Sequence, residues 1–256
     1  MRALLFARRK GLIFIFLAAF LFLGQISFKE WLTLKQEVFL LGYRFTQAKI
    51  YLYQDITVVS KKPIPQSYLI KVNNLFQKEK KYFSYEGKER VVIIFQKKQS
   101  LGGLFSPPSE GYYWGGVVYL SEDLESKALA HEMAHFLLDL KTGGKLSRYL
   151  HEGLAQWIEV NLGLPPAFLG DEKKVFISIL ELEKNLDDAE NQYAAYRQSY
   201  YFIKFLEKKK GREGIDKFLE EVKRSGKDKA FIKVYGEREK DLFKNFIIWY
   251  KLNMPF

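Results

Sequence analysis

The sequence predicts an α+β protein with a small N-terminal mixed β-sheet and a mostly helical C-terminal half. Short runs of β-branched and aromatic residues, typical of strands, fall in the first half of the chain. Beyond about residue 120 the apolar residues recur at helical spacing, and glycines or prolines separate the segments. Strands followed by helices are typical of the α+β class.

Composition bounds the class of protein further. The chain has 256 residues, 48% of them hydrophobic and 16% aromatic, which excludes a disordered protein. It contains no cysteine, so disulfides, thiolate zinc sites and cysteine nucleophiles are excluded. The net charge of +11 is spread over lysines mixed with glutamates. This favours a solvated surface over nucleic-acid binding and is compatible with attraction to an anionic membrane.

Residues 1–28 are predicted to be a signal peptide or a signal anchor. An uncharged apolar run, 11–27, follows a cluster of basic residues: Arg2, Arg8, Arg9 and Lys10. As a helix this run spans roughly 25 Å, slightly less than a hydrocarbon core of about 30 Å. No small-x-small cleavage site is evident, which favours a retained anchor. The basic flank then directs the domain formed by residues 29–256 outside the cytoplasm; if the segment is cleaved, the protein is secreted.

The β-rich part is expected within about residues 45–120. Residues 49–60 alternate in polarity like a strand, and residues 67–83 carry apolar side chains at helical spacing. Residues 91–95 form a continuous apolar run, which predicts a buried strand. Residues 112–120 predict a further strand, and the glycine pair within it indicates that another group approaches the backbone closely.

Two helices are expected within about residues 122–161, followed by C-terminal helices within about 168–252. Ser121 is a suitable cap for the first, which should run to about residue 140 and stop before a glycine pair. The second should cover about 148–161. The C-terminal helices are expected at about 171–185, 189–209, 213–224, 227–235 and 238–252.

The first of these helices carries His131, Glu132 and His135, which form an H-E-x-x-H pattern. Histidines four residues apart on a helix share one face, so both imidazoles can reach a single cation. The glutamate can then lie beside a metal-bound water and take its proton, as in zinc hydrolases. The alternative is a chance match on a buried helix.

A catalytic zinc site needs a third protein ligand and one open position. The stretch 149–157, on the second helix, offers His151 and Glu152. All three histidines of the chain lie within 21 residues, which random placement seldom produces. Both residues remain candidates on spacing alone.

These two stretches, His-Glu-Met-Ala-His and Leu-His-Glu-Gly-Leu-Ala, resemble the gluzincin zinc metallopeptidases. The resemblance is closest to bacterial peptidase-MA-like domains related to the catalytic domain of the aminopeptidase N family. It implies a thermolysin-like fold in which Zn²⁺ is held by His131, His135 and Glu152. It also implies that Glu132 is the general base.

The residues around Glu152 agree with this assignment. Gly153 leaves room for another helix to approach, and Ala155 keeps the packed face small. His151 points about 100° away from Glu152 on the same helix. It is therefore expected to be a neighbour or pocket residue and is the fallback ligand.

The relatives also carry a catalytic tyrosine before an apolar run on a later helix, and residues 196–206 resemble that segment. The resemblance gives Tyr196 the role of donor to the oxyanion. Tyr193 and Tyr200 share its helical face and are the fallbacks. With 16 tyrosines in the chain, simple packing is the alternative for each of them.

In gluzincins the strand before the motif helix borders the cleft, and the substrate backbone pairs along it. The resemblance therefore assigns substrate binding to Gly115, Gly116 and Val117. The Gly-x-Met-Glu-Asn signature that reads a free amino terminus in aminopeptidases is missing. An endopeptidase or a narrow-specificity peptidase is expected instead.

The expected function is a membrane-anchored, extracytoplasmic zinc metallopeptidase that acts on a peptide or protein. The alternative is a catalytically inactive binding or assembly module that retains the fold. Nucleic acid is not an expected partner. The sequence specifies neither the peptide that is cut nor the oligomeric state.

Overall fold

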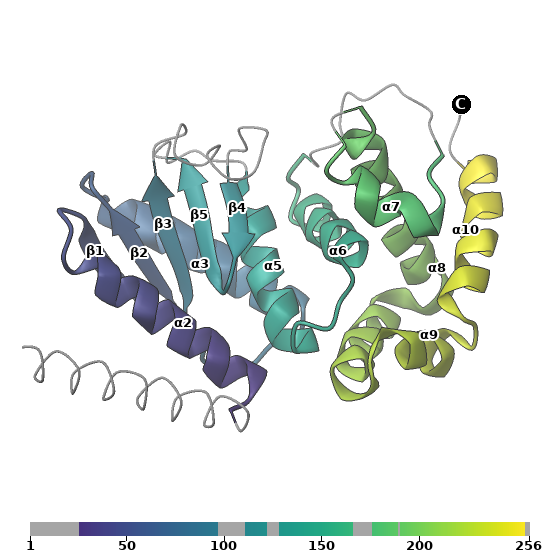
Figure 1. Cartoon of the computed structure of the whole chain (residues 1–256), viewed down its shortest axis with the longest axis horizontal. Coiled ribbons are helices and arrows are strands. Elements are labelled where there is room, and N and C mark those ends of the chain that lie inside the picture. Colours follow the sequence, from purple (N-terminus) through teal and green to yellow (C-terminus); the bar gives the residue numbers. More distant parts are fainter. Residues whose placement is uncertain (1–25, 97–110, 122–127, 166–175, 189, 254–256) are drawn as a thin grey trace, which may run out of the picture.

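The computed structural model describes residues 26–96, 111–121, 128–165, 176–188 and 190–253. A five-stranded mixed sheet with its covering helices forms one part of the molecule, and helices of the C-terminal half form the other (Figure 1). This confirms the predicted mixed sheet followed by a mostly helical half.

The predicted N-terminal anchor falls almost wholly on residues 1–25, which lie outside the described residues. Within the described ranges, no helix has both the length and the apolar character needed to cross a bilayer.

The sheet has three parallel central strands and one antiparallel strand at each edge. In spatial order the strands are β1 (Lys49–Tyr53), β2 (Ile56–Ser60), β3 (Val91–Gln96), β5 (Val117–Ser121) and β4 (Gly111–Trp114). Strands β2, β3 and β5 are buried apart from one end of β3. This explains why their sequences are continuous apolar runs and do not alternate in polarity.

Helices cover both faces of the sheet, so the domain is three layers deep here (Figure 1). Ile93 points into the main core together with residues of α3 (Gln66–Tyr82) and α5 (Ala128–Thr142). Its neighbour Ile94 points to the opposite face, into a smaller cluster under α2 (Phe28–Tyr43). Each central strand therefore contributes alternate side chains to two apolar layers.

The predictions of single strands over residues 49–60 and 112–120 were wrong, because each segment is a two-stranded hairpin. In the second hairpin the turn is Gly115–Gly116, with φ of 59° and 86°. Two successive positive φ angles define the tight turn that joins twisted antiparallel strands, and glycine adopts them without strain.

Helix α2 covers a region to which the sequence analysis assigned no element. It begins with a capping box: the Ser27 side chain accepts from the backbone N–H of Glu30, while the Glu30 carboxylate accepts from the backbone N–H of Ser27. Buried Gln36 then fixes the helix to the sheet, since its Nε2 donates to the carbonyl of Gly116 at 2.6 Å.

Most predicted helices of the C-terminal half agree with the structure, but the helix expected at about 171–185 was predicted to start too early, because residues 176–178 are not helical. The second motif helix, α6, spans Arg148–Asn161, as predicted, whereas the predicted start of α5 at Ser121 lies next to residues outside the described ranges. The remaining helices are α7 (Ile179–Asn185), α8 (Gln192–Ser225), α9 (Lys227–Tyr235) and α10 (Glu239–Asn253). Helix α8 joins two predicted helices across a kink at Gly211, where φ is 68°.

Gly153 is where α6 and α8 meet. A Cβ atom added there would lie 2.5 Å from the carbonyl oxygen of Ser199, on the α8 backbone. Because backbone cannot rotate away as a side chain can, only glycine permits this approach. The close contact fixes α6, and with it the neighbouring Glu152.

We predict that Gly153→Ala lowers the free energy of unfolding by about 1–3 kcal/mol, because α6 must move off α8 to accommodate the methyl group. Urea denaturation measures the change. Gly42→Ala is the control: Gly42 is also helical, but an added Cβ meets no atom within 4 Å. That variant should be neutral or slightly stabilised. Equal stability of the two variants would contradict the proposed packing constraint.

Candidate metal centre

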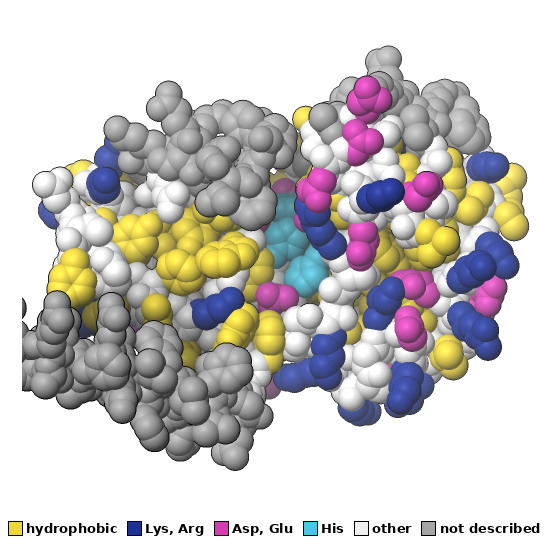
Figure 2. Space-filling view, viewed as in Figure 1, with side chains coloured by type: hydrophobic (Ala, Val, Ile, Leu, Met, Phe, Trp, Pro, Cys, Tyr) yellow, Lys and Arg dark blue, Asp and Glu magenta, His cyan; other side chains and the backbone are white. Residues whose placement is uncertain are grey.

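Helices α5 and α6 bring three side chains of metal-binding chemistry together, and histidine side chains are visible where the two parts of the molecule meet (Figure 2). His131 and His135 lie one turn apart on α5, and Glu152 faces them from α6. Candidate ligand atoms of the three residues all lie within 4.8 Å of one another. Among the residues that the structure describes, this is the one group of its kind found, and His151 does not belong to it.

The distances fit a tetrahedral zinc site. The Oε2 atom of Glu152 lies 3.0 Å from Nε2 of His131 and 3.5 Å from Nε2 of His135. Tetrahedral bonds of about 2.0–2.1 Å place neighbouring donor atoms about 3.3 Å apart. Two imidazoles and one carboxylate are also a donor set that catalytic zinc sites use. The residues present therefore fit the ion.

The electrostatics of the three residues favour a positive charge between them. Burial acts to raise the pKa of Glu152, but His135 and His131 outweigh it and hold that pKa well below its ordinary value. Burial acts to lower the pKa of His131, but the carboxylates of Glu159 and Glu152 raise it well above its ordinary value. The pKa of His135 is lowered, mainly by burial.

A buried carboxylate orients the first histidine. Nδ1 of His131 lies 3.1 Å from Oε2 of Glu159, two turns beyond Glu152 on α6. Glu159 can accept the Nδ1 proton, which leaves Nε2 facing the ligand group. This carboxylate–histidine arrangement is common around zinc and raises the basicity of the ligand.

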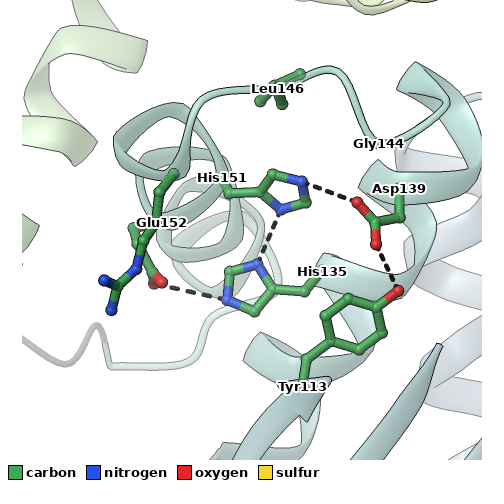
Figure 3. Close-up of a pocket in the computed structure, with 8 residues that line it drawn as sticks. Tyr113, His135, Asp139, Gly144, Leu146, His151 and Glu152 are labelled. Carbon is green, nitrogen blue, oxygen red and sulfur yellow. Dashed lines mark hydrogen bonds and ion pairs between the residues drawn. The ribbon is translucent and has the colours of Figure 1, made fainter. Parts of the chain in front are cut away.

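A second histidine and a carboxylate orient His135 (Figure 3). Nδ1 of His135 lies 3.2 Å from Nδ1 of His151, and Nε2 of His151 lies 3.2 Å from Oδ1 of Asp139. The hydroxyl of Tyr113 donates to the other oxygen of Asp139 at 2.6 Å. Asp139 can hold the proton on Nε2 of His151, whose Nδ1 then accepts from His135. Nε2 of His135 is thereby left with its lone pair towards Glu152.

Glu132 lies on the same helix and is buried. Burial, together with the charges of Glu152 and Glu159, raises the pKa of Glu132 to about 8, although His131 opposes the shift. A carboxyl whose pKa lies near neutrality can both take and release a proton. Its predicted role as general base therefore has suitable chemistry.

Tyr196 comes from α8 and lies beside the ligand group. Its pKa is raised, first by burial and then by the nearby charge of Glu152, so the hydroxyl stays a proton donor. Buried Gln156 joins the two helices, since its Nε2 donates to the carbonyls of both Glu152 and Tyr196. Of the fallback tyrosines, Tyr193 is half exposed and Tyr200 is buried with its ring against a neighbouring tyrosine. The role of Tyr196 stays a prediction.

The residues expected to bind substrate lie elsewhere. The Gly115–Gly116 turn lies against α2, where Leu32 approaches Gly116, and Val117 is buried in the cluster under α2. The group that approaches these glycines is therefore a helix of the same chain. A pocket of about 320 Å³ lies beside the candidate ligands instead, and the strand that lines it is β4, through Tyr113 (Figure 3).

Sequence reasoning missed four residues around the centre. Glu159 lies two turns beyond Glu152 on α6, and Asp139 lies one turn beyond His135 on α5. Helical spacing could therefore have found both residues. Tyr113 comes from a distant strand and carries no such signal. Glu79 of α3 is fully buried, and its carboxylate has no hydrogen-bond partner among the described residues. Burial and Glu159 raise its pKa well above the ordinary value.

Fold and site together define an α+β protein with a largely buried His-His-Glu group. No family model matches the chain. It is 28% identical, over 187 residues, to the uncharacterized protein YhcO of Bacillus subtilis (strain 168). The match covers 67% of this chain and 56% of YhcO, so the chain spans little more than half the length of that relative. The resemblance to gluzincins stays a prediction.

We predict that zinc affinity keeps rising with pH above about pH 7, where an ordinary histidine has already lost its proton. Because the pKa of His131 is raised, its imidazole still carries both ring protons above pH 7, and the metal must displace one of them. Each fall of one pH unit below that pKa should weaken binding by about tenfold. Competition with a chromophoric chelator measures the affinity. A plateau from about pH 7 upward would contradict the assignment.

We also predict that Glu159→Gln weakens zinc binding by about tenfold or more, since His131 loses its carboxylate partner. Glu213→Gln is the control, because Glu213 is an exposed carboxylate on α8 that pairs with Lys217. The same chelator competition compares both with the unmodified chain. If both variants bind zinc alike, Glu159 does not support the metal site.

Proposed function

We propose that the protein is a zinc-dependent peptidase. The observation that carries the proposal is the convergence of His131, His135 and Glu152 beside Glu132, at the edge of a pocket. A structural metal site has no need of a buried carboxyl with a pKa of about 8 next to its ligands. That carboxyl supports an enzyme over an inactive binding module.

Zinc, when bound, would supply a Lewis acid that polarises the carbonyl of the scissile bond. Glu132 takes a proton from the attacking water and passes it to the leaving amine. The hydroxyl of Tyr196 donates a hydrogen bond to the carbonyl oxygen as negative charge develops there. Glu159 and His151 hold the two histidines in the tautomers that the reaction needs.

The fold also suggests how a peptide is held. Strand β4 is an edge of the sheet, and Tyr113 on it lines the pocket. An extended peptide that adds to β4 would pass beside the candidate ligands, with its backbone held by strand hydrogen bonds. This mode needs no free amino terminus and agrees with an endopeptidase or a narrow-specificity peptidase. In this binding mode the substrate contacts β4, whereas the sequence analysis assigned that contact to residues 115–117.

We further propose that residues 1–28 anchor the peptidase in the cell membrane, with the catalytic domain outside the cytoplasm. The proposal rests on the basic cluster and the apolar run 11–27. If the segment is cleaved, the same domain is secreted.

We predict that Glu132→Gln abolishes peptide hydrolysis and leaves zinc binding intact, because glutamine keeps the shape of the side chain but cannot accept a proton from water. Mass spectrometry of a mixed peptide library measures cleavage, and metal analysis measures zinc. Glu213→Gln again serves as the control and should cleave normally. Undiminished cleavage by the Glu132 variant would overturn its role as general base.

We predict that Tyr196→Phe lowers kcat by about a hundredfold with little change in KM, since the lost hydroxyl acts mainly on the transition state. Tyr193→Phe is the matched control, because Tyr193 lies on the same helix but is half exposed. Similar kcat values for the two variants would assign Tyr196 to packing.

A further inference from the structure

Helix α2 has two apolar faces, and the core accounts for one of them. One face of α2 packs on the sheet. Leu32 is buried beside Gly116, and Gln36 donates a hydrogen bond to the carbonyl of Gly116. Phe39 packs edge-on against Tyr119. These contacts hold the helix in place. The opposite face carries a second set of hydrophobic residues that the sheet does not cover.

This second set forms an apolar stripe. Its members are Leu34, Val38 and Leu41, all at least half exposed, and exposed Phe45 follows in the turn after the helix. The spacing of four and three residues keeps Leu34, Val38 and Leu41 within about 60° on the helix, along about 10 Å of its length. A stripe of this kind on a helix that already packs its other face indicates a contact surface.

The position of α2 in the chain identifies the surface that the stripe contacts. The apolar run 11–27 ends where α2 begins, and Leu34 lies two turns further on. Ser27 has an extended backbone, with φ of −65° and ψ of 157°, and its capping box starts a new helix. Helix α2 is therefore free to turn away from the direction of the preceding segment. Two exposed cations, Arg44 and Lys49, flank Phe45, which suits anionic headgroups.

We propose that the apolar stripe of α2 lies on the lipid surface of the membrane. This inference rests on the proposed anchor, because a bilayer-spanning run 11–27 leaves α2 at the membrane surface. It does not depend on zinc or on peptide hydrolysis. A helix with its apolar face in the headgroup region would fix the orientation of the domain, which a single flexible anchor cannot do.

The orientation bears on the substrate. Phe28, the first residue of α2, packs so closely on Gly144 that an added Cβ would lie 2.6 Å from its ring. Gly144 lines the pocket beside the candidate ligands. A membrane-bound α2 therefore holds the pocket rim near the lipid surface. The substrates that reach it most readily are peptide segments close to the membrane.

The absence of cysteine from the chain allows a direct test. The variants are Val38→Cys in the stripe and Ile248→Cys on α10, at positions that are 63% and 61% exposed. Each full-length chain is labelled with bimane and reconstituted into vesicles of phosphatidylcholine and phosphatidylglycerol. Quenching by lipids brominated near the headgroup reports lipid contact, and quenching by iodide reports water contact. Recovery with the vesicles after an alkaline wash reports the anchor separately.

We expect the label at position 38 to be quenched by the brominated lipids and to be about fivefold less sensitive to iodide than the label at position 248. Equal iodide sensitivity at both positions, in chains that stay with the vesicles, would overturn the inference and leave the anchor intact. Shielding of position 38 without bromolipid quenching would also overturn it. In that case the unlabelled Val38→Cys chain is oxidised with copper phenanthroline, and a disulfide-linked dimer identifies a second chain as the occupant.

Discussion

Burial of negative charge around two imidazoles is the constraint on which the centre depends. Four carboxyl groups are almost fully withdrawn from water around His131 and His135: Glu79, Glu132, Glu152 and Glu159. Each ionised carboxylate without a partner costs several kcal/mol in such surroundings. Part of the cost is avoided because burial raises the pKa of Glu79 well above its ordinary value and so favours its neutral form. Glu152 remains ionised, and a divalent cation between it and the two histidines is the most direct compensation.

This cluster persists because the surrounding helices are fixed by packing. The contact of Gly153 with the backbone of Ser199 sets the distance between α6 and α8, and Gln156 ties the same helices beside Glu152. From the other half of the molecule, β4 supplies Tyr113, which ends the hydrogen-bonded series behind His135. The sheet thus supports the candidate metal centre through the side chains that orient the candidate ligands.

Local patterns made much of this predictable. The bounds of α6 and the separation of His131, His135 and Glu152 follow from helical spacing and from glycine and proline breaks, which act over a few residues. The two hairpins were missed because their strands are too short to show a clear period around the turns. Helix α2 was missed because it carries apolar residues on both faces, so its period is blurred. The Tyr113–Asp139–His151 series joins three elements, and only the tertiary fold brings it together.

X-ray absorption at the zinc edge of the metal-loaded chain tests the central claim most directly. We expect one zinc per chain with four nitrogen or oxygen neighbours at about 2.0–2.1 Å, two of them imidazoles. Glu152→Ala should lose one protein oxygen and keep both imidazoles, whereas His151→Ala should leave the first shell unchanged. A shell with three imidazoles, or one that Glu152→Ala leaves unaltered, would contradict the assignment of His131, His135 and Glu152 as the ligands.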